Sequence, residues 1–387
     1  MEQLLAELGN PEKKLPILHV AGTNGKGSVC AFTESILRSS GYKTGLYTSP
    51  HLVDFAERIQ INGVQAEQSL INEGISRLRR LTSQWSAQDQ PTYFELATAL
   101  AFDLFSQAAC DAVVLETGLG GRLDATNTSS KLASAVTPIA MDHTEWLGAT
   151  LGEIAREKAG IMRRGIPTVI APQEEEARES LTSYALSIGS PCQWISQPLG
   201  NELKIGLAGP HQRWNAALAL ALTEAGGFVI PRNAVVSGLA NVVWPGRFQR
   251  LRGGSLILDG AHNLHAARSL VETWKEQFGD SRCRLIFGAL ADKDPQSMLN
   301  ELECIASEIS VVPVCSSRGA DPGLFEVSSS IPFSVSGSLK EALGEMFQVR
   351  DGISAVSGRP VLVTGSLFLV GEVLALEAGG LVAPRSQ

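Results

Sequence analysis

The sequence predicts an α/β fold with two domains and mostly parallel strands. Short apolar runs alternate with longer segments of helical period, which is typical of strand-helix-strand units around a parallel sheet. This pattern restarts after a turn-rich stretch at 244–247. The chain has 387 residues, whereas a single domain usually takes about 100 to 200 residues. Together these observations favour a two-domain protein.

The elements of each domain follow from the spacing of the apolar runs. In the N-terminal domain, residues 1–244, we expect a helix at 28–38 and strands at 17–21, 44–48, 112–115 and 133–139. In the C-terminal domain, residues 245–387, we expect a helix from about 264 and strands at 256–258, 285–288, 309–314 and 361–364. The linker falls at 244–250. Ligands of such sheets bind beyond the carboxyl ends of the strands, so the polar turns there are candidate sites.

Composition and charge exclude several classes of partner. The net charge is -8 and no run of lysine or arginine forms a basic stripe, so no nucleic acid is expected. The most apolar stretch, 362–376, contains Gly371 and Glu372 and is too short to cross a bilayer, so no membrane is expected either. The cysteines lack CxxC spacing, which favours free thiols in the cytoplasm: they are Cys30, Cys110, Cys192, Cys283, Cys304 and Cys315.

A glycine-rich segment follows the first expected strand and precedes the first expected helix. Backbone amides and a helix N-terminus would converge there, which suits a polyphosphate. The segment differs from the usual phosphate-loop pattern, because Val20 takes the place of the first glycine and an extra glycine follows the lysine. An ordinary strand-to-helix turn is the alternative. Its residues are Gly22, Thr23, Asn24, Gly25, Lys26, Gly27 and Ser28.

The most informative stretch is LETGLGGRLDATN at 115–127. Glu116 ends an apolar strand, where an ionised carboxylate would carry a large desolvation cost unless a cation lies beside it. Mg²⁺ favours one or two carboxylates together with waters and phosphate oxygens. The stretch therefore suggests a magnesium site next to the phosphate loop.

Several shorter strings each have an ordinary explanation when taken alone. A Ser-Pro turn explains TSPH at 48–51, a capping box explains TYFE at 92–95, and a solvated helix face explains EK at 157–158. DH at 142–143 resembles a turn or cap, and Arg247 in a linker would usually be solvated. Their order along the chain is more informative than any one of them.

Taken together, these strings resemble the Mur ligase superfamily, above all the dihydrofolate synthase and folylpolyglutamate synthase family, from residue 8 to residue 372. The resemblance implies a P-loop-type N-terminal domain with a mostly parallel sheet and a smaller, Rossmann-like α/β C-terminal domain. It also implies an ATP- and Mg²⁺-dependent ligase that adds L-glutamate to dihydropteroate or to a reduced folate through an acyl phosphate. Ala56 and Leu264 depart from the family pattern, which has asparagine and proline there.

The resemblance also implies a role for each matching residue. ATP would be bound by the segment from Gly22 to Ser28 and by Asn215, Arg247, Asp259 and His262. One Mg²⁺ would be held by Ser49 and Glu116, and a second by His143 and a carbamylated Lys158. Lys26, Lys158 and His143 would act in catalysis, and the pterin-bearing substrate would contact Thr92, Phe94, Arg122 and Asp124.

Two other classes of protein fit part of this pattern. Mur ligases of cell-wall synthesis carry an additional N-terminal domain, whereas only about twenty residues precede the phosphate loop here. A non-catalytic ATP-binding regulator would not need the glutamate, histidine and lysine. The sequence leaves open whether dihydropteroate, a folate monoglutamate or a polyglutamate is the preferred acceptor. The family resemblance implies a monomer.

Overall fold

The computed structural model describes residues 1–128, 130–327, 331–347 and 359–379. Two compact units divide the chain: unit 1 contains Met1–Gly206 and Gln212–Val243, and unit 2 contains Leu207–His211 and Trp244–Gln387. The sequence placed one change of domain near 245, yet the chain already enters unit 2 at 207–211. The Gly209-Pro210 pair in this excursion indicates a turn into a helix, and the helix α8 (Pro210–Ala225) does begin there, but the pair does not indicate a change of unit.

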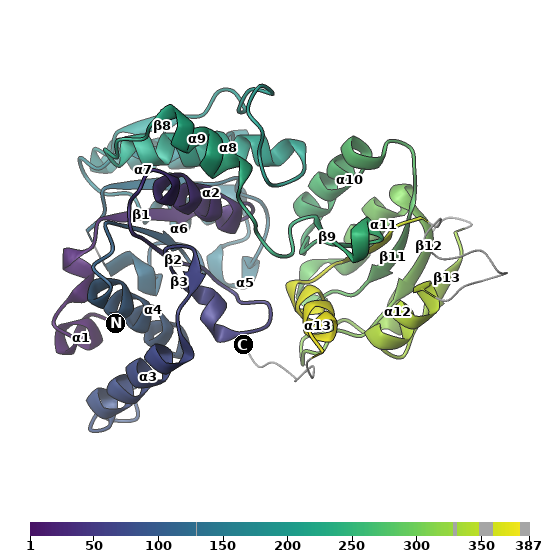
Figure 1. The fold of residues 1–387 in the computed structure, drawn as a ribbon, viewed down its shortest axis with the longest axis horizontal. Helices are drawn as coiled ribbons and strands as arrows, with labels where there is room; N and C mark the ends of the chain where they lie inside the picture. Colours follow the sequence, from purple (N-terminus) through teal and green to yellow (C-terminus); the bar gives the residue numbers. More distant parts are fainter. Residues whose placement is uncertain (129, 328–330, 348–358, 380–387) are drawn as a thin grey trace. The chain divides into compact units, whose positions relative to one another are not determined.

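Unit 1 is built on an eight-stranded sheet in the order β4-β3-β2-β5-β1-β6-β7-β8 (Figure 1). The pairs from β2 to β8 are parallel, while β3 and β4 form an antiparallel edge. The strands are β1 Ile17–Ala21, β2 Thr44–Tyr47, β3 Ile59–Ile61, β4 Val64–Gln65, β5 Ala112–Glu116, β6 Ala133–Val136, β7 Thr168–Ile170 and β8 Cys192–Trp194. The expected mostly parallel sheet is confirmed.

Helices cover both faces of this sheet, which is why its central strands are apolar without alternation. Figure 1 shows α2, α8 and α9 on one face and α1, α3 and α4 on the other. The helices are α1 Glu2–Glu7, α2 Lys26–Ser39, α3 Gln68–Thr82, α4 Tyr93–Gln107, α5 Thr144–Leu147, α6 Leu151–Ala159, α7 Glu175–Ile188, α8 Pro210–Ala225 and α9 Arg232–Ala240. In the described part of the chain, none of the helices is both long and apolar enough to span a bilayer.

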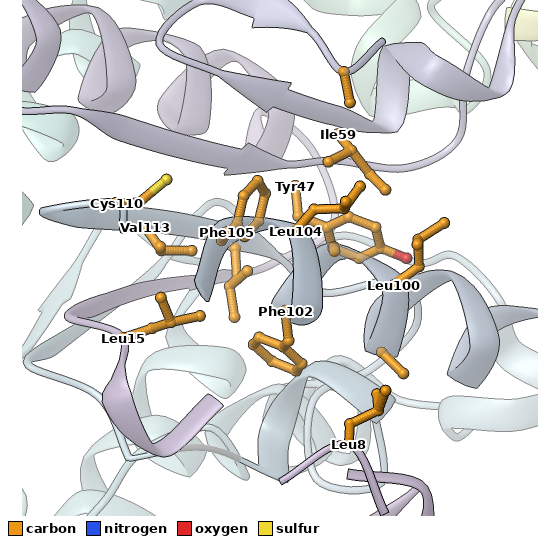
Figure 2. Close-up of a cluster of buried hydrophobic side chains, with 14 of the residues drawn as sticks. Leu8, Leu15, Tyr47, Ile59, Leu100, Phe102, Leu104, Phe105, Cys110 and Val113 are labelled. Atoms are coloured by element: carbon orange, nitrogen blue, oxygen red, sulfur yellow. The ribbon is translucent and has the colours of Figure 1, made fainter. Parts of the chain in front are cut away.

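The core on the α4 side of the sheet is dense in aromatic rings (Figure 2). Phe102 and Phe105 of α4 are fully buried against Tyr47 and Val113 of the sheet. A Cβ atom on Gly45 would lie 2.7 Å from the Phe105 ring, so glycine lets helix and strand approach. This packing fixes the position of β2 and β5, whose carboxyl ends carry site residues.

Unit 2 has a six-stranded sheet in the order β13-β12-β11-β14-β10-β9, parallel except for the β9–β10 pair. Its strands are β9 Gln249–Leu251, β10 Leu256–Leu258, β11 Cys283–Phe287, β12 Ala306–Val311, β13 Phe333–Val335 and β14 Val361–Thr364. Its helices are α10 Leu264–Phe278, α11 Pro295–Leu302, α12 Leu339–Phe347 and α13 Leu367–Glu377. Trp274 of α10 and Phe287 of β11 lie at the centre of its core.

Short 3-10 helices connect these elements at Pro11–Lys14, Phe55–Arg58, Ala125–Thr128, Arg252–Gly254, Ala291–Lys293, Glu303–Ile305 and Pro322–Leu324. Two strands end three residues earlier than the sequence suggested: β6 ends at Val136 rather than 139, and β12 at Val311 rather than 314. A proline follows each by two residues, Pro138 and Pro313, and proline has no amide hydrogen to continue the ladder. Both expected ends were wrong because apolar residues continue past the last paired one.

The first prediction concerns the core. Phe102→Ala should destabilise the protein by about 3 to 5 kcal/mol, because it removes a fully buried ring and leaves a cavity. Val64→Ala, at an edge position that is 69% exposed, should change stability by no more than about 0.5 kcal/mol. Urea denaturation followed by circular dichroism measures both. A cost below about 1 kcal/mol for Phe102→Ala would contradict the close packing described here.

Candidate functional site

The loop between β1 and α2 depends on two glycines. Gly22 has φ +148°, and a Cβ there would lie 1.8 Å from the Thr137 hydroxyl oxygen. Gly25 has φ +90°, and a Cβ there would lie 2.7 Å from Oδ1 of Asn215. Helix α2 then begins at Lys26 without a side-chain cap, so its first-turn amides have no acceptor within the helix. Such a terminus binds anions, as the sequence indicated.

Two lysines converge on one backbone carbonyl in this loop. The Lys26 Nζ donates to the Gly22 carbonyl at 3.2 Å and to the Thr23 carbonyl at 3.1 Å. The Lys158 Nζ, from α6, donates to the same Gly22 carbonyl at 2.8 Å. Lys158 is 4% exposed. Burial, together with the nearby Lys26 charge, lowers the pKa of Lys158 to about 7, although Asp142 and Asp124 oppose that shift.

Glu116 lies at the carboxyl end of β5, in register with Val20 of β1. It is 5% exposed, and its Oε2 accepts a hydrogen bond from the Ser49 amide at 3.1 Å. Burial raises the pKa of the Cys30 thiol, Glu116 raises it further, and Lys26 opposes both. The charges of Glu116 and Lys26 therefore both act on the buried Cys30 thiol, which places them close to each other. Ser49, Glu116 and the phosphate loop lie together at one edge of the sheet.

The residues at this edge fit a magnesium ion better than a metal bound only by protein. Among the described residues, no three His, Cys, Asp or Glu side chains form a group that could hold a metal. Glu116 offers a carboxylate and Ser49 a hydroxyl, so the remaining ligands would be waters and phosphate oxygens. Mg²⁺ commonly keeps such a shell, whereas structural zinc requires four protein ligands.

Asp142 and His143 form a second polar pair, and Asp142 acts on the charge of Lys158. His143 has a left-handed backbone, φ 52°, and its Nε2 lies 3.8 Å from Oδ1 of Asp142. Asp142 is buried and favours the charged form of Lys158, whereas the His143 side chain is 38% exposed. Sequence reasoning selected His143 and Lys158 but missed Asp142. Its position next to His143 was the available signal.

Asp124 organises its own loop. Its Oδ2 accepts the amides of Gly118 and Leu119, each at 2.9 Å. Its Oδ1 accepts the Thr126 amide at 3.0 Å and the Thr126 hydroxyl at 2.5 Å. Arg122 is paired with Glu157, with 3.0 Å from Nε to Oε1. The contacts expected between these two residues and the pterin stay predictions.

Thr92 and Phe94 have different surroundings. Thr92 caps α4 in a reciprocal capping box with Glu95, so local structure explains its hydroxyl. The Phe94 ring packs against the loop after Glu116, since a Cβ on Gly118 would lie 2.4 Å from its Cζ. Phe94 thus touches the loop that carries the candidate metal ligand, and a direct substrate contact remains a prediction.

Helix α8 supports the phosphate loop from one side. Asn215 donates to Gln212 at 3.0 Å, and Gln212 donates to the Ser28 hydroxyl at 3.3 Å. Ser28 is 1% exposed. Its bond to Gln212 agrees with assigning the metal to Ser49 rather than to Ser28. Gln212 was not selected from the sequence, because only the folded chain brings α8 to this loop.

The remaining candidates belong to unit 2. Asp259 follows β10, and its two oxygens accept the amides of Phe248 and Ala261, each at 2.9 Å. Burial raises the pKa of Asp259, and Arg247 opposes that shift. His262 bonds through Nδ1 to the Gly260 carbonyl at 2.8 Å. Arg247, Asp259 and His262 therefore form one polar group at the carboxyl end of β10.

Comparison with known proteins identifies the family. Residues 246–366 match the family described as Mur ligase, glutamate ligase domain. The chain is 36% identical to the dihydrofolate synthase/folylpolyglutamate synthase of Bacillus subtilis (strain 168), over 96% of this chain and 93% of that protein. The chain belongs to the dihydrofolate synthase/folylpolyglutamate synthase family. Members of this family are ATP-dependent glutamate ligases of the Mur ligase type.

Solved structures of the family share the whole fold. Mycobacterium tuberculosis folylpolyglutamate synthase, complexed with ADP and AMPPCP, superposes with a TM-score of 0.89 at 29% identity, over 97% of this chain and 94% of that one. E. coli FolC in complex with DHPP and ADP gives 0.85 at 33% identity, over 97% and 92%. The family suggested by the motifs and its Mur ligase-like fold are both confirmed.

The second prediction follows from Lys158. A free lysine has a pKa of 10.5 and Lys158 one of about 7, so between these values the unfolded synthase binds one more proton than the folded one. Stability should therefore rise with pH in this window, by up to about 1.4 kcal/mol per pH unit from this group. Lys158→Met should have a flatter profile than the wild type between pH 7 and 9. Urea denaturation in CO₂-free buffer measures both, and identical slopes would contradict the assignment.

Proposed function

We propose that this chain joins L-glutamate to dihydropteroate or to a reduced folate, using ATP and Mg²⁺. The observation that carries the proposal is the meeting of Lys26 and Lys158 at the Gly22 carbonyl, beside Glu116 and Ser49. Lys26 and a helix N-terminus would bind phosphate oxygens, and the Glu116 carboxylate would balance them through a cation. Family membership supplies the substrates.

ATP would lie with its β and γ phosphates against the loop from Gly22 to Ser28. Lys26 would contact the terminal phosphates, and Asn215 lies against Gly25 where it could also approach the nucleotide. Arg247, Asp259 and His262 are proposed to contact ATP as well, as the family resemblance implies. The relatives solved with ADP support this assignment.

Magnesium would be held by Ser49 and Glu116, and a second ion by His143 and a modified Lys158. When bound, these ions supply positive charge that neutralises the phosphate oxygens. Lys158 is proposed to react with CO₂: the neutral amine attacks the carbon, a proton leaves, and a carbamate anion forms. Its lowered pKa leaves a substantial neutral fraction near pH 7. Lys158 would then attract a cation instead of repelling it.

The reaction needs no nucleophile from the protein. The acceptor carboxylate takes the γ-phosphoryl group and releases ADP, and the amino group of glutamate then attacks the acyl phosphate and releases phosphate. Lys26 and the loop amides would stabilise the charge on the transferred group. Phe94, Arg122, Asp124 and Thr92 would position the acceptor, so that catalysis rests mainly on orientation.

Monomeric, cytoplasmic action is part of the proposal. The monomer is an expectation from the family resemblance. All six cysteines are free thiols, which suits a reducing compartment. Light scattering coupled to size exclusion would test the monomer, and a dimer that persists on dilution would contradict it.

The third prediction tests the reaction itself. Purified protein with ATP, Mg²⁺ and labelled glutamate should transfer label to dihydropteroate, to a reduced folate, or to both. Glu116→Gln should lower kcat/KM by about 100-fold or more, since the carboxylate that balances the cation is lost. Glu34→Gln is the matched control, because Glu34 is as buried as Glu116 and bonds Arg38 of α2 and Thr44 of β2, away from the proposed metal site. It should keep activity within about threefold.

Each outcome of that assay is decisive. If neither acceptor gains label, glutamate ligation to folates is not the activity of this chain. If Glu116→Gln ligates as well as Glu34→Gln, the proposed metal site is wrong. Nucleotide binding without ligation in the wild type would favour the non-catalytic regulator.

The fourth prediction concerns the modification of Lys158. Protein equilibrated with ¹³CO₂ should give a carbamate signal in its ¹³C NMR spectrum, and Lys158→Met should lack it. Acidification should remove the signal, because protonation of the carbamate releases CO₂. A signal that is unchanged in Lys158→Met would assign the carbamate to another amine.

A further inference from the structure

A chain of buried polar groups lies beneath the loop at 116–127, and the proposed mechanism does not use it. His19 is fully buried in the middle of β1, the central strand of the sheet. Thr126 is fully buried, and Lys131 is 4% exposed. Burying a lysine and a histidine costs folding free energy unless their polar atoms are hydrogen-bonded, so their hydrogen-bond partners determine that cost.

The contacts form a continuous series. Lys131 Nζ lies 2.7 Å from His19 Nδ1, and His19 Nε2 lies 2.7 Å from the Thr126 hydroxyl oxygen. The Thr126 hydroxyl donates to Oδ1 of Asp124 at 2.5 Å. Lys131 also donates to Oδ1 of Asn127 and to the Ile161 carbonyl, each at 2.9 Å. We call His19, Thr126 and Lys131 the buried relay.

The direction of these hydrogen bonds follows from the Asp124 carboxylate. The Thr126 hydroxyl donates its hydrogen to Asp124, so its oxygen accepts from His19 Nε2, and in a neutral ring His19 Nδ1 then accepts from Lys131. Burial and the Arg163 charge lower the pKa of Lys131 well below its usual value, and the amine has hydrogens to donate in either protonation state. Burial lowers the pKa of His19, and the Lys131 and Arg163 charges lower it further, so the ring stays neutral. Asp124 is left as a carboxylate that holds the Gly118 and Leu119 amides.

The relay also connects two segments that carry site residues. Asp124 orders the loop that follows Glu116, and Lys131 bonds Ile161 just beyond α6, the helix that carries Lys158. Asn127 strengthens this connection, because its Nδ2 donates to the Gly160 carbonyl at 2.9 Å. One buried lysine therefore anchors the loop after β5 and the end of α6 to the central strand.

We propose that His19 and Lys131 are positioning residues for ligation: through Thr126 and Asp124 they hold the loop after Glu116 and the end of α6 in the reactive arrangement. The part of this inference that concerns turnover rests on the proposed function. The part that concerns loop order does not. Breaking the relay should loosen the Gly118 and Leu119 amides and slow ligation, even where the protein remains folded.

Thr126→Val tests the relay with the smallest change, because valine keeps the shape and removes the hydroxyl. Thr126→Ser restores the hydroxyl and is the conservative variant. Thr168→Val is the matched control: Thr168 is also fully buried in unit 1, and its hydroxyl bonds Ser134 at 2.7 Å, outside the relay. Lys131→Met removes the relay from its other end. Thermal denaturation first establishes that all four variants are folded at the assay temperature.

Two measurements follow on each variant. Amide hydrogen exchange at 117–123 should be about tenfold faster in Thr126→Val and Lys131→Met than in Thr168→Val, because the loop loses its anchor. In the ligation assay, kcat/KM should fall by about tenfold or more in the same two variants and stay within about threefold of wild type in Thr126→Ser and Thr168→Val. If Thr126→Val and Thr168→Val lose the same amount of stability, the differences in their exchange rate and kcat/KM do not come from unfolding.

The outcomes separate this inference from the proposed function. Unchanged exchange in Thr126→Val would overturn the relay whether or not the wild type ligates. Faster exchange with turnover equal to Thr168→Val would overturn the positioning role. A wild type that transfers no glutamate would contradict the proposed function, and the exchange contrast would still decide whether the relay holds the loop.

Discussion

The candidate site depends on the close approach of Gly22 to the neighbouring strand end. With no side chain at that position, the backbone of the phosphate loop lies against Thr137, and the Gly22 carbonyl becomes the point where Lys26 and Lys158 meet. Any larger residue would push the loop away and separate the two amines. The position of the two lysines, and with it the charge of the site, therefore depends on Gly22 having no Cβ atom.

Burial lowers the pKa of three basic side chains of unit 1: His19, Lys131 and Lys158. Lys158 and Lys131 are both about as buried as a side chain can be, yet their surroundings differ. Burial and a neighbouring cation lower the pKa of both, with Arg163 beside Lys131 and Lys26 beside Lys158. Lys131 has three acceptors around its amine, and Lys158 donates to the Gly22 carbonyl. The same residue type therefore anchors a loop in one place and is the amine proposed to react with CO₂ in the other.

Local pattern predicted the elements and the family, and long-range packing explains what it missed. The bounds of β1, β10 and β14 follow directly from their apolar runs, and the strings at 22–28 and 115–127 led to the family. The change of unit at 207–211 has no local signal, because the Gly209-Pro210 pair there indicates only the start of a helix. Gln212 and the buried relay gain their roles only from partners distant in the sequence, and a histidine in an apolar strand resembles any buried polar residue.

The contact between Gly25 and Asn215 has a consequence for the order of events during synthesis. The phosphate loop is among the first segments to be made, but its left-handed turn at Gly25 lies against a helix that comes far later in the chain. Until that helix has left the ribosome, Gly25 lacks this neighbour, and a glycine can sample many conformations. A nascent chain thus carries the complete nucleotide-binding motif well before it can bind a nucleotide.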